Sequence, residues 1–234
     1  GFFLFMVLLL IFTLPFQMKT INFIVDGFNL YHSAKRAAWE LKITTKWLNI
    51  HGLCSSLIHV VSQVLGERTA LKNIYYFSAL ADHLEGSHPG ITGRHKAFIR
   101  CVKDTGIVVE LSRFKPKEIK CPYRQCGRTF VKHEEKETDV ATALKLIEVL
   151  LTDECDAVVL MTGDTELAPA VRTAQRLFPT KRILFAFPPY RKNRELATLA
   201  PGSFRFRTTQ LAKYQFPDPY ITQTGLVIRK PHNW

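Results

Sequence analysis

Polar and acidic residues follow or open apolar segments at three places in this chain, namely Ile24–Asn29, Glu137–Val140 and Leu160–Glu166. A continuous β-rich run that breaks into a turn, as Ile21–Val25 does before Asp26, is typical of a buried parallel strand. Ligand sites in open α/β sheets lie in the crevice outside the carboxyl ends of such strands. We therefore expect the acidic side chains of these segments to converge in one crevice.

Converging carboxylates point to a bound divalent cation. Two close carboxylates repel by roughly 4 kcal/mol at an effective dielectric constant of about 20, and a cation or a shifted pKa normally offsets that cost. Mg²⁺ selects oxygen ligands and leans on one or two carboxylates, waters and a substrate phosphate. We expect Asp26 and Asp164 to be direct ligands and Asp139 to be a ligand or to orient the attacking water. Asn29 would position a phosphate or a water.

Each of these acids also has a purely structural interpretation. Asp26 stands in a turn after a strand, Asp139 in the first turn of a helix, where an acid is favourable, and Asp164 where a helix cap is needed. Any one of them alone is more often structural. Their occurrence together, on the expected elements, favours the metal site.

Strands and helices alternate along the chain. Apolar β-rich runs predict five strands, at 21–25, 74–80, 107–111, 156–161 and 182–187, and residues 203–208 are a candidate edge strand. Helical spacing predicts helices at 30–41, 47–65, 94–103, 137–151 and 165–178, the fourth with Val140, Leu144, Ile147 and Leu151 on one face. This order predicts a three-layer α/β/α fold with a mainly parallel sheet of about five strands.

With 234 residues and 47% hydrophobic content, the chain is long enough for one sizeable domain. We expect that domain at 18–214, with a basic, cysteine-containing insertion at about 112–136 and an extended tail at 215–234. The apolar residues 1–17 are shorter than the roughly twenty that cross a bilayer and lack the flanks of a signal peptide. Because Met18 leads straight into the first strand, we expect 1–17 to be upstream sequence outside the fold; a membrane anchor and an accessory apolar segment are the alternatives.

Positive charge surrounds an acidic stretch. Residues 94–136 hold twelve Lys/Arg against five Asp/Glu, and residues 181–234 hold ten against two, whereas residues 137–180 hold eight acids against three bases. A cationic surface around an acidic focus suits a polyanion whose backbone is held by Lys and Arg while a metal sits at the acids. A basic protein with solvated charged helices is the alternative.

Together, Ile24–Tyr31, Lys136–Val140 and Met161–Glu166 resemble the three signature motifs of NYN domains, which are PIN-like ribonuclease relatives, in the same order and at comparable spacing. The resemblance covers about residues 19–200. It implies a PIN-like Rossmannoid sandwich, a Mg²⁺ or Mn²⁺ site and cleavage of RNA. On this pattern Asp26, Asp139 and Asp164 match the acidic metal positions and Asn29 the polar one. Glu166 stands where the family more often has aspartate, so its metal contact would run through water or be absent.

Two further segments are candidates for binding. Phe187–Arg194 follows the last long strand and mixes an aromatic with cations, a combination that holds a backbone and stacks a base; its candidate RNA contacts are Tyr190, Arg191, Lys192 and Arg194, joined by Arg124 and Arg128 from the insertion. The pair Cys121 and Cys126 has a spacing that zinc sites allow, but it needs two more donors. Two free thiols on a basic loop are the alternative.

Three functions compete on this sequence. The first is a metal-dependent ribonuclease, which requires RNA and Mg²⁺ or Mn²⁺ and no small-molecule cofactor. The second is a catalytically silent RNA-binding or scaffold module, which Glu166 favours. The third, a magnesium phosphohydrolase for small phosphoesters, would not need so extended a cationic surface. Because the five cysteines form no visible disulfide framework, a reducing cytoplasm is the simplest expected location.

Overall fold

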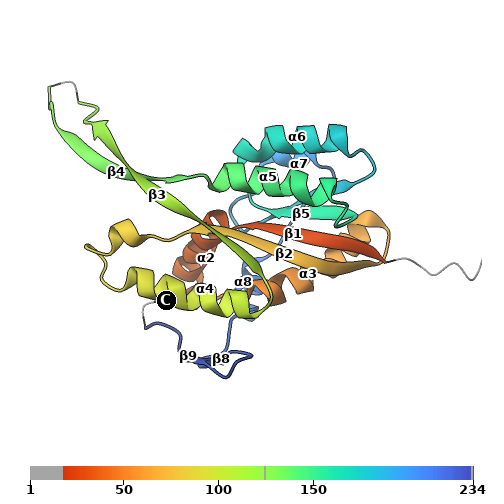
Figure 1. Cartoon of the computed structure of the whole chain (residues 1–234), viewed down its shortest axis with the longest axis horizontal. Helices are drawn as coiled ribbons and strands as arrows, with labels where there is room; N and C mark the ends of the chain where they lie inside the picture. Colours follow the sequence, from red (N-terminus) through yellow and green to blue (C-terminus); the bar gives the residue numbers. More distant parts are fainter. Residues whose placement is uncertain (1–17, 124, 233) are drawn as a thin grey trace, which may run out of the picture.

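The computed structural model describes residues 18–123, 125–232 and 234, so the expectations for residues 1–17 and for Arg124 lie outside the described residues. The described residues form a central seven-stranded sheet in the order β4-β3-β2-β1-β5-β6-β7 (Figure 1). Its strands are β1 (Lys19–Asp26), β2 (Thr69–Ala79), β3 (Val108–Lys120), β4 (Thr129–Lys136), β5 (Ala157–Met161), β6 (Arg182–Phe187) and β7 (Phe204–Arg205). Neighbouring strands are parallel except β3 and β4.

Helices cover both faces of this sheet, which confirms the predicted three-layer α/β fold. One layer contains α2 (Gly27–Leu41), α3 (Ile50–Leu65), α4 (Ile91–Asp104) and α8 (Thr208–Lys213). The other contains α5 (Thr138–Leu151), α6 (Ala168–Leu177) and α7 (Arg194–Leu199) (Figure 1). Single turns of 3-10 helix, η1 (Asp82–Leu84) and η2 (Thr165–Leu167), follow β2 and β5.

The sheet has more strands than the five predicted. Residues 203–208, the candidate edge strand, supply the short β7, and the basic insertion supplies the rest of the difference. The third strand does not stop at Leu111: it continues to Lys120 and turns back as β4, so that Arg113–Lys120 pairs with Thr129–Lys136. We call these two segments the ribbon. It projects from the body of the molecule (Figure 1), and its Lys- and Arg-rich sequence hid its β character because most of its side chains meet solvent.

Strand β1 shows why the sheet is buried on both faces. Ile21, Phe23 and Val25 point into the core beneath α2 and α3, whereas Ile24 points into the core beneath α5 and α6. Successive side chains of a strand alternate between the two faces. A run that is apolar at nearly every position therefore contributes to two cores, and it places Asp26, its last residue, at the sheet edge.

Most of the apolar face predicted for α5 points outward, although Ile147, one of its four residues, packs against the core. Val140, Leu144 and Leu151 are 64%, 64% and 70% exposed, and the buried aliphatic residues are Leu146, Val149 and Leu150. Both sets recur at helical spacing, so the periodicity identified the helix but not the face that meets the sheet. Contact with the sheet and with α6 selects the second set.

The C-terminal residues pack against the α4 side of the domain. They form a small antiparallel pair, β8 (Tyr220–Ile221) with β9 (Val227–Ile228). Trp234 then donates an Nε1 hydrogen bond of 2.6 Å to the carbonyl oxygen of Lys46, and its ring centroid lies 5.4 Å from that of Phe98. Residues after 214 thereby help to build the surface beside α4.

Candidate active site

Asp26 lies where β1 ends and α2 begins, and it is only 6% exposed. One carboxylate oxygen, Oδ1, accepts a hydrogen bond from the backbone N–H of Asn29 at 2.9 Å, which caps the helix. The other, Oδ2, accepts from the Asn29 side-chain amide at 2.6 Å and from the Thr162 hydroxyl at 2.8 Å. Gly27 is needed next, because a Cβ there would lie 2.5 Å from the Phe77 carbonyl oxygen. The buried carboxylate is thus fixed from three directions.

The end of β5 is tied to the same group. Thr162 also accepts a hydrogen bond of 3.0 Å from the backbone N–H of Asp164, and the Gly163 N–H lies 3.4 Å from the Asn29 side-chain oxygen. The Asp164 carboxylate accepts a 3.0 Å hydrogen bond from the Glu166 N–H and so caps η2. Because β1 and β5 are parallel neighbours with Val25 opposite Met161, their acidic ends lie side by side.

The third acid reaches the crevice from the start of α5. Asp139 is half-buried, and burial together with the charges of Asp164, Asp26, Glu166 and Glu135 raises its pKa to about 6. Burial is also the main reason that the pKa of Asp26 is raised, with a smaller contribution from Asp164. All four acids predicted from the sequence therefore interact electrostatically at one edge of the sheet, and Asn29 lies among them.

Sequence reasoning missed one member of this group. Glu135, near the end of β4, has a raised pKa because of burial and the charge of Asp26, against a hydrogen bond of 2.6 Å that it accepts from the Thr138 hydroxyl. It lies within a run of Lys and Glu in the insertion, which looks uniformly solvated. The sequence signal that could have placed Glu135 at the site was its position four residues before Asp139. The pairing of β4 with β3 decides that Glu135 turns inward.

The donor set suits a hard divalent cation that keeps most of its water. Among the described residues, no three His, Cys, Asp or Glu side chains are grouped closely enough to hold a metal ion between them. Magnesium, however, usually takes one or two carboxylates and several waters. The mutual repulsion that raises the pKa of Asp139 is the kind of strain that a cation relieves. The exposed Glu166 would contribute through water.

The predicted RNA-contacting loop lies against this site. A Cβ at Gly163 would lie 2.0 Å from the Arg191 carbonyl oxygen, so only glycine lets the two loops pack. Arg191, Lys192 and Arg194 are exposed. Tyr190 is held against α2: its hydroxyl bonds to Glu40, and the guanidinium of Arg36 lies 4.3 Å from its ring centroid. One face of that ring is therefore covered.

The cysteine pair lies at the tip of the ribbon. Cys121 is partly exposed, Cys126 and Arg128 are exposed, and both cysteines are free thiols. Within the described part of the chain, no further His, Cys, Asp or Glu completes a metal-binding group with them. The ribbon carries the pair away from the body of the molecule (Figure 1). Zinc at this pair remains a prediction without support from the contacts.

Comparison with known proteins addresses the family and the fold. The family model described as NYN domain matches residues 20–203, and no curated protein matches the chain. The structure is similar to the crystal structure of a protein of unknown function from Vibrio parahaemolyticus, with a TM-score of 0.50 and 15% identity over 83% of this chain and 97% of that one. Within the described residues, no helix has the length and apolar character that a bilayer crossing requires.

Proposed function

The chain belongs to the NYN domain family, a PIN-like nuclease fold, and from this premise we propose that it is a metal-dependent ribonuclease. The observation that carries the proposal is the convergence of Asp26, Asp139 and Asp164, whose charges act on one another at the carboxyl edge of the sheet. A carboxylate cluster of this kind does not stabilise the fold by itself, because its negative charges repel one another. It becomes favourable when a cation and a phosphodiester occupy the crevice.

Asp26 and Asp164 would hold the cation, with Mg²⁺ or Mn²⁺ as the candidates. When bound, such an ion supplies Lewis-acid stabilisation of the phosphate and of the leaving oxygen. The Asp26 carboxylate is pre-oriented by its bonds from Asn29 and Thr162, so it does not have to be ordered when the substrate binds. Fixed donors and acceptors of this kind lower the reorganisation that the reaction requires.

Asp139 would orient the attacking water. It lies in the first turn of α5, and its carboxylate is half-buried rather than enclosed. Glu166 and Glu135 add negative charge around it. Asn29 is committed to Asp26, so its role is to position that carboxylate rather than to contact the phosphate directly.

RNA is the substrate that the surface favours. Arg191 lies in the turn that packs on Gly163, with Lys192 and Arg194 directly after it, and the ribbon adds several lysines, next to Arg128. Cations spread over two separate segments suit an extended phosphate backbone rather than one small phosphoester. The Tyr190 ring, with Arg36 on one face, is 37% exposed and would stack a base.

The test is cleavage of a labelled single-stranded RNA by the Asp164→Asn variant. Asparagine is as good a helix cap as aspartate, so the bond to the Glu166 N–H can persist while the charge is lost. We expect cleavage in Mg²⁺ to fall at least a hundredfold, with an unchanged melting temperature. Glu67→Gln, an exposed acid outside the crevice, is the matched control.

Two outcomes would contradict the proposal in different ways. Cleavage by Asp164→Asn at the rate of the unmodified protein would remove these acids from the chemistry. RNA binding without any cleavage in Mg²⁺ or Mn²⁺ would instead favour the second candidate, a silent RNA-binding module. The exposed Glu166, in place of the more usual aspartate, is the feature that speaks for that candidate.

A further inference from the structure

A cavity of about 390 Å³ opens beside the acidic crevice on the α2 side of the sheet. Its walls come from the first turns of α2, the end of β2, η1, α4 and the C-terminal residue Trp234. Ligand pockets for small organic groups span about 300 to 1,000 Å³ and are mostly apolar with a few placed polar atoms. The cavity fits this description in both size and lining.

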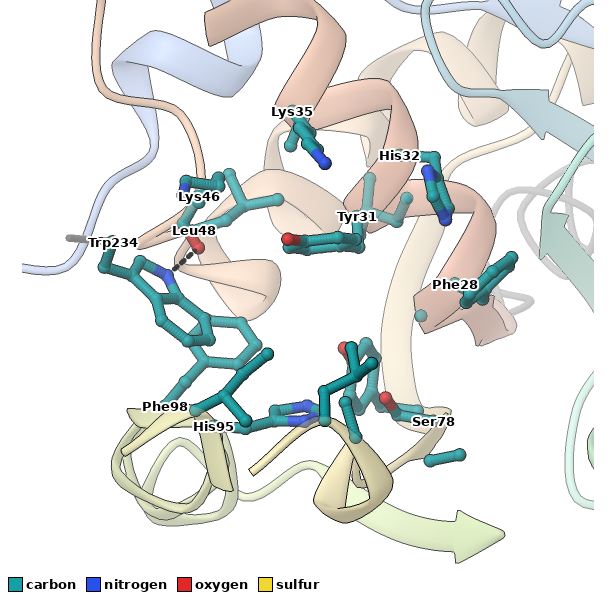
Figure 2. Close-up of a pocket in the computed structure, with 18 of the residues that line it drawn as sticks. Phe28, Tyr31, His32, Lys35, Lys46, Leu48, Ser78, His95, Phe98 and Trp234 are labelled. Atoms are coloured by element: carbon teal, nitrogen blue, oxygen red, sulfur yellow. Dashed lines mark hydrogen bonds between the residues drawn. The ribbon is translucent and has the colours of Figure 1, made fainter. Parts of the chain in front are cut away.

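Aromatic rings form opposite walls of the cavity. Figure 2 shows the Tyr31 ring on one side of the open space and His95 on the other, with Trp234 and Phe98 closing one end. Trp234 is fixed by its bond to Lys46 and by its contact with Phe98. Tyr31 is 41% exposed although it lies on the cavity wall. A flat ligand can therefore enter an open cavity whose end wall, Trp234, is already held in place.

Two imidazole rings, those of His83 and His95, belong to the lining. The Nδ1 atom of His83 is buried and has no hydrogen-bond partner, while the ring itself stacks on that of His133 at 4.5 Å. Burial lowers the pKa of His95 and of His83, so both imidazoles are neutral near pH 7 and offer one donor and one acceptor each.

Cations gather at one end of the cavity. Lys35 and Lys46 belong to its lining (Figure 2). Burial and the charges of Lys35 and Arg94 lower the pKa of Lys46. Likewise, burial and the charges of Arg191 and Lys35 lower the pKa of His32. Positive charges that repel one another beside an aromatic cavity favour an anionic group on the ligand that the cavity binds.

The cavity is continuous with the candidate active site along the chain. Its lining begins at Gly27 and Phe28, directly after Asp26. On the same helix, the pKa of His32 is lowered in part by the charge of Arg191, which belongs to the loop that packs on Gly163. A nucleotide adjacent to the one at the acids could therefore reach the cavity without leaving the cationic surface.

We propose that this cavity is a nucleobase pocket, in which an unstacked base slides between Tyr31 and His95 while its phosphate lies at Lys35 and Lys46. The proposal rests on the proposed ribonuclease function, and it identifies the base as the part of the RNA that the protein recognises. Aromatic side chains that splay and stack single bases are how proteins usually recognise unpaired RNA. Trp234, which lies beyond the matched family segment 20–203, supplies part of the wall.

The first experiment measures binding of AMP by titration calorimetry in EDTA, with ribose 5-phosphate as the probe that lacks a base. We expect AMP to bind and ribose 5-phosphate to bind at least tenfold more weakly, because only the base can stack. Tyr31→Ala should weaken AMP binding about fivefold to a hundredfold. Trp39→Ala is the matched control, since Trp39 is on the same helix, 72% exposed and outside the cavity. Equal binding of both probes, or an unchanged affinity in Tyr31→Ala, would overturn the proposal.

The second experiment identifies the source of the base with an uncut oligoribonucleotide, also in EDTA. A matching loss of RNA affinity in Tyr31→Ala, with competition by AMP, assigns the pocket to a base of the bound RNA. AMP binding with an unchanged RNA affinity assigns it to a free mononucleotide. Neither measurement depends on cleavage, so a pocket that binds AMP in a protein that does not cut RNA would reject the ribonuclease and keep the pocket.

Discussion

At the scale of single residues, Asp139 is the most pH-sensitive part of the site. Its pKa of about 6 lies above the value of an exposed aspartate, because of burial and of the surrounding carboxylates. A raised pKa means that the folded protein holds this proton more tightly than the unfolded chain does. The stability that this tighter proton binding adds is thus complete below about pH 4, declines as the pH rises through about 6, and is absent at neutral pH.

Asp139→Asn should therefore stabilise the metal-free protein near neutral pH. In EDTA at pH 7.5 we expect a melting temperature higher by roughly 2–4 °C, the change that about 1 kcal/mol produces in a domain of this size. This expectation is already reduced for the partial exposure of the side chain. At pH 4 the difference should vanish. Thermal unfolding across this range measures it, with Glu67→Gln as the control, and a variant less stable at pH 7.5 would contradict the repulsion.

At the scale of elements, α5 combines an outward apolar face with an inward one. Leu144 is 64% exposed and Leu146 is 1% exposed, two residues apart on the same helix. Leu146→Ala should destabilise the fold by about 2–5 kcal/mol because it opens a cavity in the core. Leu144→Glu should change the free energy of unfolding by no more than about 0.5 kcal/mol. Urea unfolding of the two variants tests this. A large decrease in the free energy of unfolding of Leu144→Glu would show that the outer face is covered in solution.

The ribbon carries both ion-paired and unpaired charges. Glu134 pairs with Lys117 and Lys136, and Glu137 pairs with Arg113 and Lys115. Three exposed cations, on the outer half of the ribbon or next to it, form no ion pair with any described residue: Lys120, Arg128 and Lys132.

If RNA lies along this ribbon, replacing the three cations Lys120, Arg128 and Lys132 with serine should weaken RNA binding and flatten its salt dependence. Three lost phosphate contacts reduce the slope of log affinity against log salt by about 2 for a single strand. The same replacement at Lys19, Arg68 and Lys72, which lie toward the opposite end of the strands, removes equal charge. An equal effect from both sets would mean that net charge alone drives the binding.

At the scale of the whole molecule, local patterns predicted the layers and four converging acids but not the contacts between segments that are distant in sequence. Asp26 and Asp164 were predictable because a strand end is a local signal, and parallel pairing brings such ends together. Glu135 was not, since the antiparallel pairing of the ribbon decides which way it faces. The aromatic cavity was missed for the same reason: Tyr31 and Trp234 are about two hundred residues apart in sequence, and no periodicity links them.

Because β3 is one continuous strand, its length sets the distance from the core sheet to the ribbon tip. A single strand pairs with β2 in the core and then runs for eight paired positions along the ribbon, on the order of 26 Å at about 3.3 Å per residue. β4 returns over the same span and ends at Lys136, three residues before Asp139. An RNA strand bound along the ribbon would have to span this distance to reach from the acids to the ribbon tip. Affinity should accordingly climb with oligonucleotide length until the strand reaches the tip and then level off, so that short fragments are released while longer strands stay bound.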